Sequence, residues 1–575
     1  MAGSTIRAMA AIRGIRFGRA ATGLGLILLY AALAVWSTWP LSRNPVAAIP
    51  LGQSQCATVP LFNLWTIWWN ADRLRHGLNE YWDAPIFYPE RDTFAFSEPQ
   101  PMTMIVAPVL WITGSRALAF NLYLWLALVL NGVFTFRLLR LLGMGQLIAA
   151  AAGAGMLLLP IVHWQLDVLQ LAPVWGILWT WTALIKTARR PTLARGAEIG
   201  AAFGVTFLTC AHQGLLLAVL LMGAIWALPW RWRRGGLWLA ALAGVLVGGG
   251  FIGPVVSRLH HVMAKHAFTR KPDLVSQLSA MPGDYTAPPG RQLIDFGPVA
   301  SRPFWRLSPG WLKTGLAVVG IAYGASRRRW RRWTAFLFVM ALLGVLLSLG
   351  TNLKVWSWEP WWTLTRFWPG LAQVRNVFRF AFFVQMAVVL LAAQGTYALL
   401  LAERRLITKR SWRVAAGSVL ALTGLAAVFE TSPETTNLRM LPDPSLNAEW
   451  IDYLRRETPR RRSVACLPFA RGDRVEDYET TAWWMYYGTF HHVPLVDGYS
   501  GFFPPDHFQL RDAINQYPLT EEVVKRVADK EAEFLVLDWS LVPASALGER
   551  SFGFYSLRRV FESSNGIEVY RLETR

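Results

Sequence analysis

Residues 378–402 read FRFAFFVQMAVVLLAAQGTYALLLA, an apolar run of 25 residues with a single charged side chain, Arg379. An α-helix needs about 20 mainly apolar residues to cross the hydrocarbon core of a bilayer, so this run is long enough to span it. Ten other apolar runs are of the same kind, and we therefore predict eleven transmembrane helices. They are Ala21–Trp39, Ala117–Phe136, Leu147–Trp164, Leu171–Ile185, Gly196–His212, Leu215–Pro229, Leu237–Val256, Trp311–Ser326, Trp333–Leu349, Phe378–Ala402 and Trp412–Phe429.

The composition of the 575-residue chain agrees with a membrane protein. Hydrophobic residues make up 54% of it and charged residues 16%, whereas ordinary soluble domains have roughly 25% charged residues. Only three cysteines occur, which excludes a disulfide-rich scaffold. The run from Ala21 to Trp39 is long for the core of a signal peptide, and no A-x-A-like cleavage site follows it. We therefore predict an α-helical polytopic membrane protein that keeps its first helix.

The formal net charge of +21 is compatible with either nucleic acid or a membrane surface as partner. If the N-terminus is cytoplasmic, the short inner segments together carry the whole +21, and the rest of the chain is neutral. These segments contain the clusters Arg7–Arg19, Arg137–Arg140, Lys186–Arg195, Arg231–Arg234, Arg327–Arg332 and Arg404–Arg413. Because cytoplasmic loops are enriched in Lys and Arg, we predict a plasma (inner) membrane protein with an extracytoplasmic C-terminus and no nucleic-acid partner.

Most of the soluble mass is therefore predicted on the outer side. Residues 1–429 form the predicted transmembrane domain, including a first outer loop at 40–116, and residues 430–575 form a small extracytoplasmic α/β domain. Within that domain we predict helices at Asn447–Glu457 and Leu519–Asp529, strands at Ser463–Leu467 and Phe534–Asp538, and a hairpin of Arg559–Glu562 and Ile567–Leu572 around Asn565-Gly566. The segment Pro101–Thr113 is apolar but short, and is predicted to be interfacial or re-entrant.

The first outer loop mixes carboxylates with aromatic residues. Carboxylates accept hydrogen bonds from hydroxyl groups and rings cover the apolar face of a sugar, so this mixture suits a carbohydrate. The carboxylates are Asp72, Glu80, Asp83, Glu90, Asp92 and Glu98. Trp65, Trp68 and Trp69 fit either that use or an interfacial helix with Trp anchors at headgroup level. Glu98 is flanked by proline just before an apolar run, where an acid is costly unless it has a function.

A second polar group lies at the outer end of the third predicted span. His163 and Asp167 are four residues apart and share a face if the helix continues. They fit a general base or a hydrogen-bonding site for substrate at the membrane boundary, or else a polar helix end that faces headgroups. His212 and Gln213 end the fifth span on the same side and have the same two interpretations.

A third group consists of arginines on the outer side, where the charge rule does not explain them. Arg375 and Arg379 are at i and i+4 where the tenth span opens, and Arg366 precedes them. Because a guanidinium forks onto phosphate oxygens, a lipid-phosphate site is one interpretation. The other is that these side chains reach outer headgroups or pair with outer acids.

The remaining motifs do not point to a defined reaction. His260, His261 and His266 lie in a loop rich in Pro and Gly, and we predict no cofactor, although a divalent metal stays open. The loop Asp497–Pro505 is interpreted either as docking the C-terminal domain onto the membrane part or as a wall of an acceptor groove. No GxSxG motif or P-loop occurs, so common hydrolase and NTPase chemistry has no support.

The chain resembles the GT-C superfamily of integral membrane glycosyltransferases, and in particular bacterial multi-pass members. Val59–Pro101, Arg366–Arg379 and Val496–Pro505 carry the resemblance, which spans most of the chain. It implies transfer of a sugar, of hexosyltransferase type, from a polyprenyl-phosphate donor to a glycan, lipid or protein acceptor on the outer face. It further implies that an acid in the first loop is the base and that outer basic residues hold the lipid phosphate.

One departure from that pattern bears on the site. The family usually has an acid soon after the first span, but Pro40–Asn70 contains none, with Gln53 and Gln55 in that region instead. A glutamine is no general base, so the expected catalytic residues are Glu98, Asp167 and Asp83, and the expected substrate-binding residues are His163, Arg366, Arg375, Arg379, Trp82 and Tyr88. The alternatives are a non-catalytic protein that binds or helps export envelope polysaccharide, and a transporter, which the lack of acids within the spans disfavours.

Overall fold

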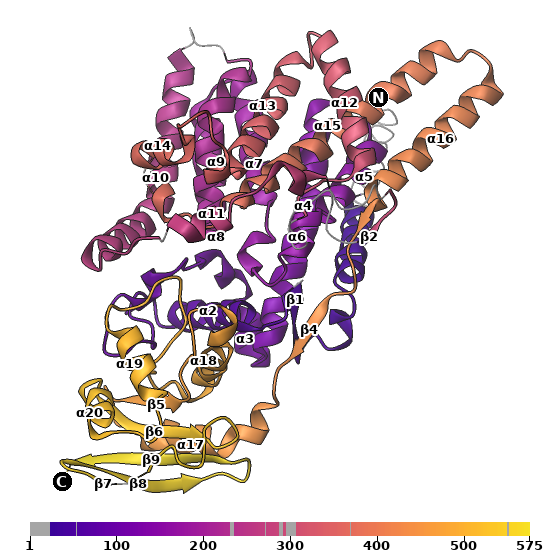
Figure 1. Cartoon of the computed structure of the whole chain (residues 1–575). Coiled ribbons are helices and arrows are strands. Elements are labelled where there is room, and N and C mark those ends of the chain that lie inside the picture. Colours follow the sequence, from indigo (N-terminus) through magenta and orange to yellow (C-terminus); the bar gives the residue numbers. More distant parts are fainter. Residues whose placement is uncertain are drawn as a thin grey trace, which may run out of the picture.

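A computed structural model describes residues 23–52, 54–230, 235–270, 272–286, 291–294, 306–368, 370–548 and 551–574. Helices gather at one end of the molecule and a sheet formed by the C-terminal residues lies at the other end (Figure 1). Helices α2 and α18 lie between the two ends (Figure 1). The basic residues Arg7 to Arg19, Gln53 and the cluster Arg231–Arg234, which entered the sequence predictions, lie outside the described residues.

Each of the eleven apolar runs coincides with helical structure. The helices are Gly23–Ser37, α4 (Arg116–Leu142), α5 (Gln146–Leu157), α6 (Pro160–Trp164), α7 (Trp175–Arg189), α8 (Leu193–Thr209), α9 (Ala211–Ala224), α10 (Gly235–Lys265), α12 (Trp311–Ser326), α13 (Arg331–Ser348), α15 (Ala381–Leu406) and α16 (Arg410–Phe429). In the described chain, six are long and apolar enough to cross a bilayer. The chain is thus a multi-pass membrane protein, and the count of about eleven spans is not confirmed.

One predicted span, Leu147–Trp164, is broken, and polar side chains explain how the break is tolerated. Helix α5 ends at Leu157 and α6 begins at Pro160, whose ring cannot continue the preceding helix. The freed backbone N–H of Ile161 donates to Gln385 Oε1 on α15 at 3.0 Å. Since an unsatisfied backbone group is costly in a membrane, this bond allows the chain to turn there toward the loop that carries Asp167.

Glycines let helices α8 and α10 pack closely together. Gly196 and Gly200 of α8 lie against the backbone of Ala240 and Gly244 of α10. A Cβ atom on Gly200 would lie 2.3 Å from the Gly244 carbonyl oxygen, which leaves no room for a side chain. Small residues at this spacing let transmembrane helices approach closely, and the outer ends of both helices contribute to the cavity described below.

We expect Gly200→Ala to lower the free energy of unfolding by about 1–3 kcal/mol, because the new methyl group must push the two helices apart. The thermal unfolding midpoint in detergent measures the effect. Gly249→Ala on α10 is the matched control, since a Cβ there meets no atom within 4 Å. Equal midpoints for the two variants would show that the close approach of α8 and α10 does not contribute to stability.

The first outer loop contains β1 (Ala48–Gly52), α2 (Thr58–Arg75), the 3-10 helices η2 (Thr93–Phe96) and η3 (Pro101–Val106), and α3 (Ala107–Thr113). The tryptophans of α2 contradict both sequence interpretations. Trp65, Trp68 and Trp69 are 1%, 5% and 5% exposed, so they neither anchor a helix at headgroups nor offer a face to sugar. The reason is tertiary: α18 of the C-terminal region packs onto α2, and His492 at its end lies edge-on to Trp68. Trp65 and Trp69 stack on each other and pack against Phe94 of the same loop.

The C-terminal region has a five-stranded mixed sheet in the order β5-β6-β9-β8-β7. Its elements are β3 (Thr431–Ser432), β4 (Asn437–Met440), α17 (Ala448–Glu457), β5 (Ser463–Leu467), α18 (Glu479–His491), α19 (His507–Ile514), α20 (Glu521–Asp529), β6 (Ala532–Asp538), β7 (Ser551–Phe552), β8 (Tyr555–Glu562) and β9 (Ile567–Thr574). The predicted helices, strands and hairpin all occur, and β5 has the predicted ends. A division at residue 430 stays a prediction.

Backbone hydrogen bonds join this region to the first outer loop. Tyr88 N–H donates to the Leu495 carbonyl at 3.0 Å, and Leu495 N–H donates to the Pro85 carbonyl at 3.1 Å. Strand β1 pairs with β4 in antiparallel register, with Ile49 opposite Arg439. At the start of α4, Arg116 donates to the Thr489 carbonyl of α18 at 2.7 Å. The C-terminal region is therefore held against the outer loop along several segments.

Candidate functional site: a polar cavity beside the outer helix ends

One cavity of about 510 Å³ lies where the ends of α8 to α10 meet the C-terminal region. Five parts of the chain line it: the first outer loop, the segment after α6, the ends of α8 to α10 with the loop after them, the segment before α15, and the loop 499–502. Its polar lining includes Glu98, His212, Arg270, Arg375, Arg379 and Tyr499. Its apolar lining includes Phe207, Leu215, Val256, Leu259 and Met263. The cavity is thus amphiphilic, with both an apolar wall and charged groups.

The segment that carries Glu98 is fixed to α2 by buried amides. Asn70 Nδ2 donates to the Pro99 carbonyl at 2.8 Å and to the Gln100 carbonyl at 3.1 Å. Gln100 has a φ of 47°, in the left-handed region, and its Nε2 donates to Asn63 Oδ1 at 2.9 Å. Buried amides of this kind are costly unless satisfied, so the network specifies one conformation for the turn after Glu98.

Glu98 points at the start of helix α9. Its Oε1 accepts the His212 backbone N–H at 3.1 Å, and its Oε2 accepts the Cys210 thiol at 3.5 Å. Burial raises the pKa of Glu98, while the charge of Arg379 and the bonds from Cys210 and His212 oppose that shift. A carboxyl with a raised pKa beside a cavity suits proton transfer.

Arg375 and Arg379 line the same cavity. Arg375 precedes the 3-10 helix η9 (Val377–Phe380), and Arg379 lies in η9, directly before α15. Within the described parts of the chain, neither forms an ion pair with a carboxylate within 4.0 Å. The Nε atom of Arg379 is buried without a hydrogen-bond partner. A guanidinium that is sheltered and not saturated by protein acceptors can receive an anion from a ligand.

Asp167 lies next to this site rather than on its lining. Helix α6 ends at Trp164, so Asp167 follows in a turn, and the conditional expectation that it shares a helix face with His163 does not apply. Burial raises the pKa of Asp167 to about 7, and the charge of Arg379 opposes the shift. Its neighbours Val168 and Gln170 line the cavity, and Asn63 Nδ2 reaches the Asp167 carbonyl at 3.5 Å.

The structure places three other predicted residues outside the cavity. Asp83 pairs with Arg91 at 2.8 Å on the surface of the first loop. Tyr88 donates its hydroxyl to the Arg461 carbonyl and to Glu531, both at 3.0 Å. The Trp82 ring packs edge-on against Tyr81 with centroids 5.0 Å apart. Each of these side chains has a partner within the protein.

His163 and Arg366 are also absent from the cavity lining. His163 is 7% exposed, and its Nε2 lies 3.1 Å from the Leu157 carbonyl at the break between α5 and α6. Arg366 is exposed on α14 (Pro360–Phe367). The structure therefore brings together Glu98, Arg375 and Arg379, with Asp167 beside them, while the roles assigned to these residues stay predictions.

Sequence reasoning missed Arg270. It lies in the outer loop after α10 and lines the cavity beside Arg375. The signal was available, because Arg270 is an outer arginine that the charge rule does not explain, like Arg375 and Arg379. No pattern in the sequence, however, places a loop residue against a segment more than a hundred positions away.

In the described chain, no group of three or more His, Cys, Asp or Glu residues is placed so that it could hold a metal ion. The prediction that three histidines lie in a loop is wrong for His260 and His261, which belong to α10, because that helix continues to Lys265. His260 lines the cavity, and His266, which follows α10, stacks on Phe268 with centroids 5.0 Å apart. The expectation that no cofactor takes part stays a prediction.

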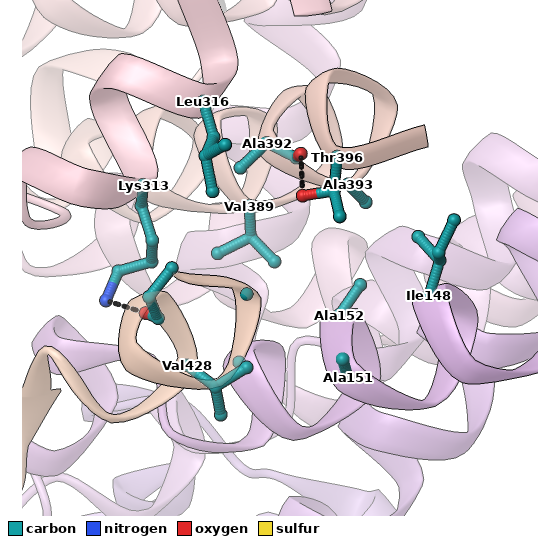
Figure 2. A pocket seen from close by; sticks show the side chains of 13 residues that line it. Ile148, Ala151, Ala152, Lys313, Leu316, Val389, Ala392, Ala393, Thr396 and Val428 are labelled. Carbon is teal, nitrogen blue, oxygen red and sulfur yellow. Dashed lines mark hydrogen bonds between the residues drawn. The ribbon is translucent and has the colours of Figure 1, made fainter. Parts of the chain in front are cut away.

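A second pocket, of about 60 Å³, lies among α5, α12, α15 and α16 (Figure 2). Its walls are small and apolar, and Figure 2 shows Lys313 as the one charged side chain at its edge. Lys313 Nζ donates to the Ala427 carbonyl at 3.0 Å and lies 3.7 Å from Glu430, so its charge is paired within the protein. This pocket has neither the size nor the free polar groups for a sugar substrate.

No protein-family model matches the chain, and no curated protein matches its sequence. Among solved structures, the chain is similar to arabinofuranosyltransferase AftD from Mycobacteria, with a TM-score of 0.56 and 13% identity. That similarity covers 96% of this chain and 40% of AftD. The chain is also similar to ArnT from Cupriavidus metallidurans in the apo state, with a TM-score of 0.44 and 13% identity over 96% of this chain and 98% of ArnT.

The similarity shows that this chain shares the fold of AftD over most of its length. The chain spans about 40% of the length of AftD. The ArnT similarity, with its lower TM-score, adds nothing to this conclusion. At 13% identity a shared fold does not establish a shared activity, so the activity has to be argued from the cavity itself.

Proposed function

We propose that this chain is a membrane glycosyltransferase that transfers a sugar from a polyprenyl-phosphate-linked donor to an acceptor hydroxyl. The observation that carries the proposal is that Glu98, Arg375 and Arg379 line one cavity that also has an apolar wall. The guanidinium groups suit the donor phosphate and the apolar wall suits the start of an isoprenoid chain. The fold shared with AftD supports the same class of reaction.

In the proposed reaction, an acceptor oxygen attacks the anomeric carbon of the donor sugar. The new bond to that oxygen forms as the bond between the anomeric carbon and the phosphate oxygen breaks, and the electron pair leaves with polyprenyl phosphate. Glu98 accepts the acceptor proton, and Arg375 and Arg379 stabilise the charge that develops on the leaving phosphate. Asp167 is the second acid near Arg379 and is the alternative candidate for the general base.

The uneven distribution of Lys and Arg along the sequence supports one orientation of the protein in the membrane. With the N-terminus cytoplasmic and the C-terminus extracytoplasmic in the plasma (inner) membrane, the cavity opens on the outer side. The acceptor is then a glycan, a lipid or a protein presented there.

A non-catalytic function is the second candidate, and one observation favours it: Pro40–Asn70 contains no acid. Such a protein would bind or help export envelope polysaccharide, using the cavity as a binding site without turnover.

The purified protein in lipid nanodiscs is expected to release polyprenyl phosphate from a polyprenyl-phosphate sugar when an acceptor-containing membrane extract is added. The double variant Glu98→Gln, Asp167→Asn is expected to release none, because it has no base. Transfer that survives in the double variant would eliminate the proposed mechanism. Glycan binding by the wild type without any release would favour the non-catalytic function.

A further inference from the structure

A tyrosine of the C-terminal region lines the cavity together with one of its arginines. The two residues are Tyr499 and Arg375, and the charge of Arg375 acts on the Tyr499 hydroxyl, where it opposes the rise in pKa that burial causes. The tyrosine ring is 7% exposed and packs edge-on against Phe62 of α2, with centroids 5.6 Å apart. Its backbone N–H lies 3.2 Å from the sulfur of Met485 on α18. Tyr499 is therefore held from several sides, and it offers Arg375 a fixed acceptor.

A clamp holds the loop that carries Tyr499. Arg270 donates to the Gly501 carbonyl at 2.8 Å and to the Gln373 carbonyl at 3.3 Å. Its guanidinium lies over the Phe502 ring at 3.7 Å, and the Phe268 ring stacks on Phe502 at 4.8 Å with an interplanar angle of 6°. Arg270 thus joins the loop after α10, the segment before α15 and the C-terminal loop.

This clamp requires an arginine at position 270. Burial lowers the pKa of Arg270 to about 9, which leaves it protonated at pH 7. In the described chain it has no carboxylate within 4.0 Å, so the two carbonyls and the Phe502 ring are its acceptors. A planar guanidinium can bond to carbonyls and stack on a ring at once, whereas an ammonium cannot do both in this geometry.

We propose that the C-terminal region completes the anion site, with Tyr499 and Arg270 as positioning residues. Tyr499 sets the orientation of Arg375, and the clamp of Phe268, Phe502 and Arg270 holds Tyr499 in place. The inference rests on the proposed function, because it takes Arg375 to bind the donor phosphate. In addition, the C-terminal loop is then necessary for binding of that phosphate.

The test for Tyr499 measures binding of farnesyl phosphate, a short polyprenyl phosphate, to the full chain in lipid nanodiscs. Tyr499→Phe removes one hydroxyl and is expected to weaken binding about tenfold, the effect of one hydrogen bond to a charged group. Tyr478→Phe is the matched control, since that hydroxyl receives a bond from Arg511 at 3.1 Å and lies off the cavity. It should bind like the wild type.

The test for Arg270 adds hydrogen exchange of the backbone amides at residues 499–502. Arg270→Met is expected to weaken farnesyl phosphate binding and to speed exchange there, and Arg270→Lys is expected to do both to a smaller extent. If Arg270→Met weakened binding with exchange unchanged, Arg270 would be a direct anion ligand, and the positioning role would be wrong.

The two proposals fail in different ways. If the wild type did not bind farnesyl phosphate, the proposed function would fall, and this inference with it. If Arg375→Gln abolished binding while Tyr499→Phe bound like the wild type, the phosphate site would stand. The contribution of the C-terminal region would then be refuted.

Discussion

Glu98→Gln is expected to lower the rate of sugar transfer by about 10²–10⁴-fold, the usual effect of losing a general base. The fold should survive, because the glutamine oxygen can still accept the His212 N–H and the amide nitrogen can donate to the Cys210 sulfur, which replaces the bond that the thiol donates to Glu98. Steady-state transfer in nanodiscs gives the rate, and the unfolding midpoint in detergent checks the fold. Glu80→Gln, an exposed acid of the same loop, is the control and should transfer at the wild-type rate.

The pH dependence of the wild type is part of the same prediction. A base must be ionised to accept a proton, and burial raises the pKa of Glu98. The rate should therefore fall as the pH is lowered, and it should do so at a higher pH than for an ordinary glutamate. A rate that stays constant down to the normal range of a glutamate, or a Glu98→Gln variant with full activity, would assign the base to another group.

Arg379→Gln is expected to weaken donor binding by about 100-fold, the range found when one partner of a buried charge pair is removed. Arg379 lines the cavity with an unsatisfied Nε atom, and its positive charge also acts on Glu98 and Asp167. Its loss should therefore raise the pKa of both acids and move the low-pH fall in rate to higher pH. Farnesyl phosphate binding and the pH–rate profile measure the two effects separately.

The control for this variant is Arg75→Gln, which removes an exposed arginine at the end of α2. It should change neither the binding nor the pH profile. Weaker binding without a displaced profile would mean that Arg379 contacts the donor but does not influence the acids. An unchanged affinity would remove Arg379 from the phosphate site altogether.

Part of the site can be predicted from sequence, because residues that violate a local rule for membrane proteins are easy to recognise. Glu98 was selected as an acid beside an apolar run, and Arg375 and Arg379 as outer arginines that contradict the charge rule. All three line the cavity. Asp83, Trp82 and Tyr88 were selected for residue type alone, and the structure gives each a partner within the protein.

The tryptophans of α2 show why residue type was insufficient. Trp65, Trp68 and Trp69 suit headgroups, sugars and protein cores equally well by composition. What decides among these is which side chains cover them. Phe94, from a later part of the same loop, packs against Trp65 and Trp69, and α18, about four hundred positions further along the chain, packs onto α2 beside Trp68. Burial of this kind depends on contacts between distant segments, which periodicity cannot show.

The sequence by itself determined the apolar helices, the distribution of charge and the order of strands and helices in the C-terminal region, because these follow from local length, periodicity and turn residues. Only the tertiary structure decided which polar residues share a cavity. Glu98, Arg270, Arg379 and Tyr499 come from four separate segments, and their meeting depends on closely packed helices, buried amides and a clamp between regions. A single sequence carries no local signal for such long-range packing.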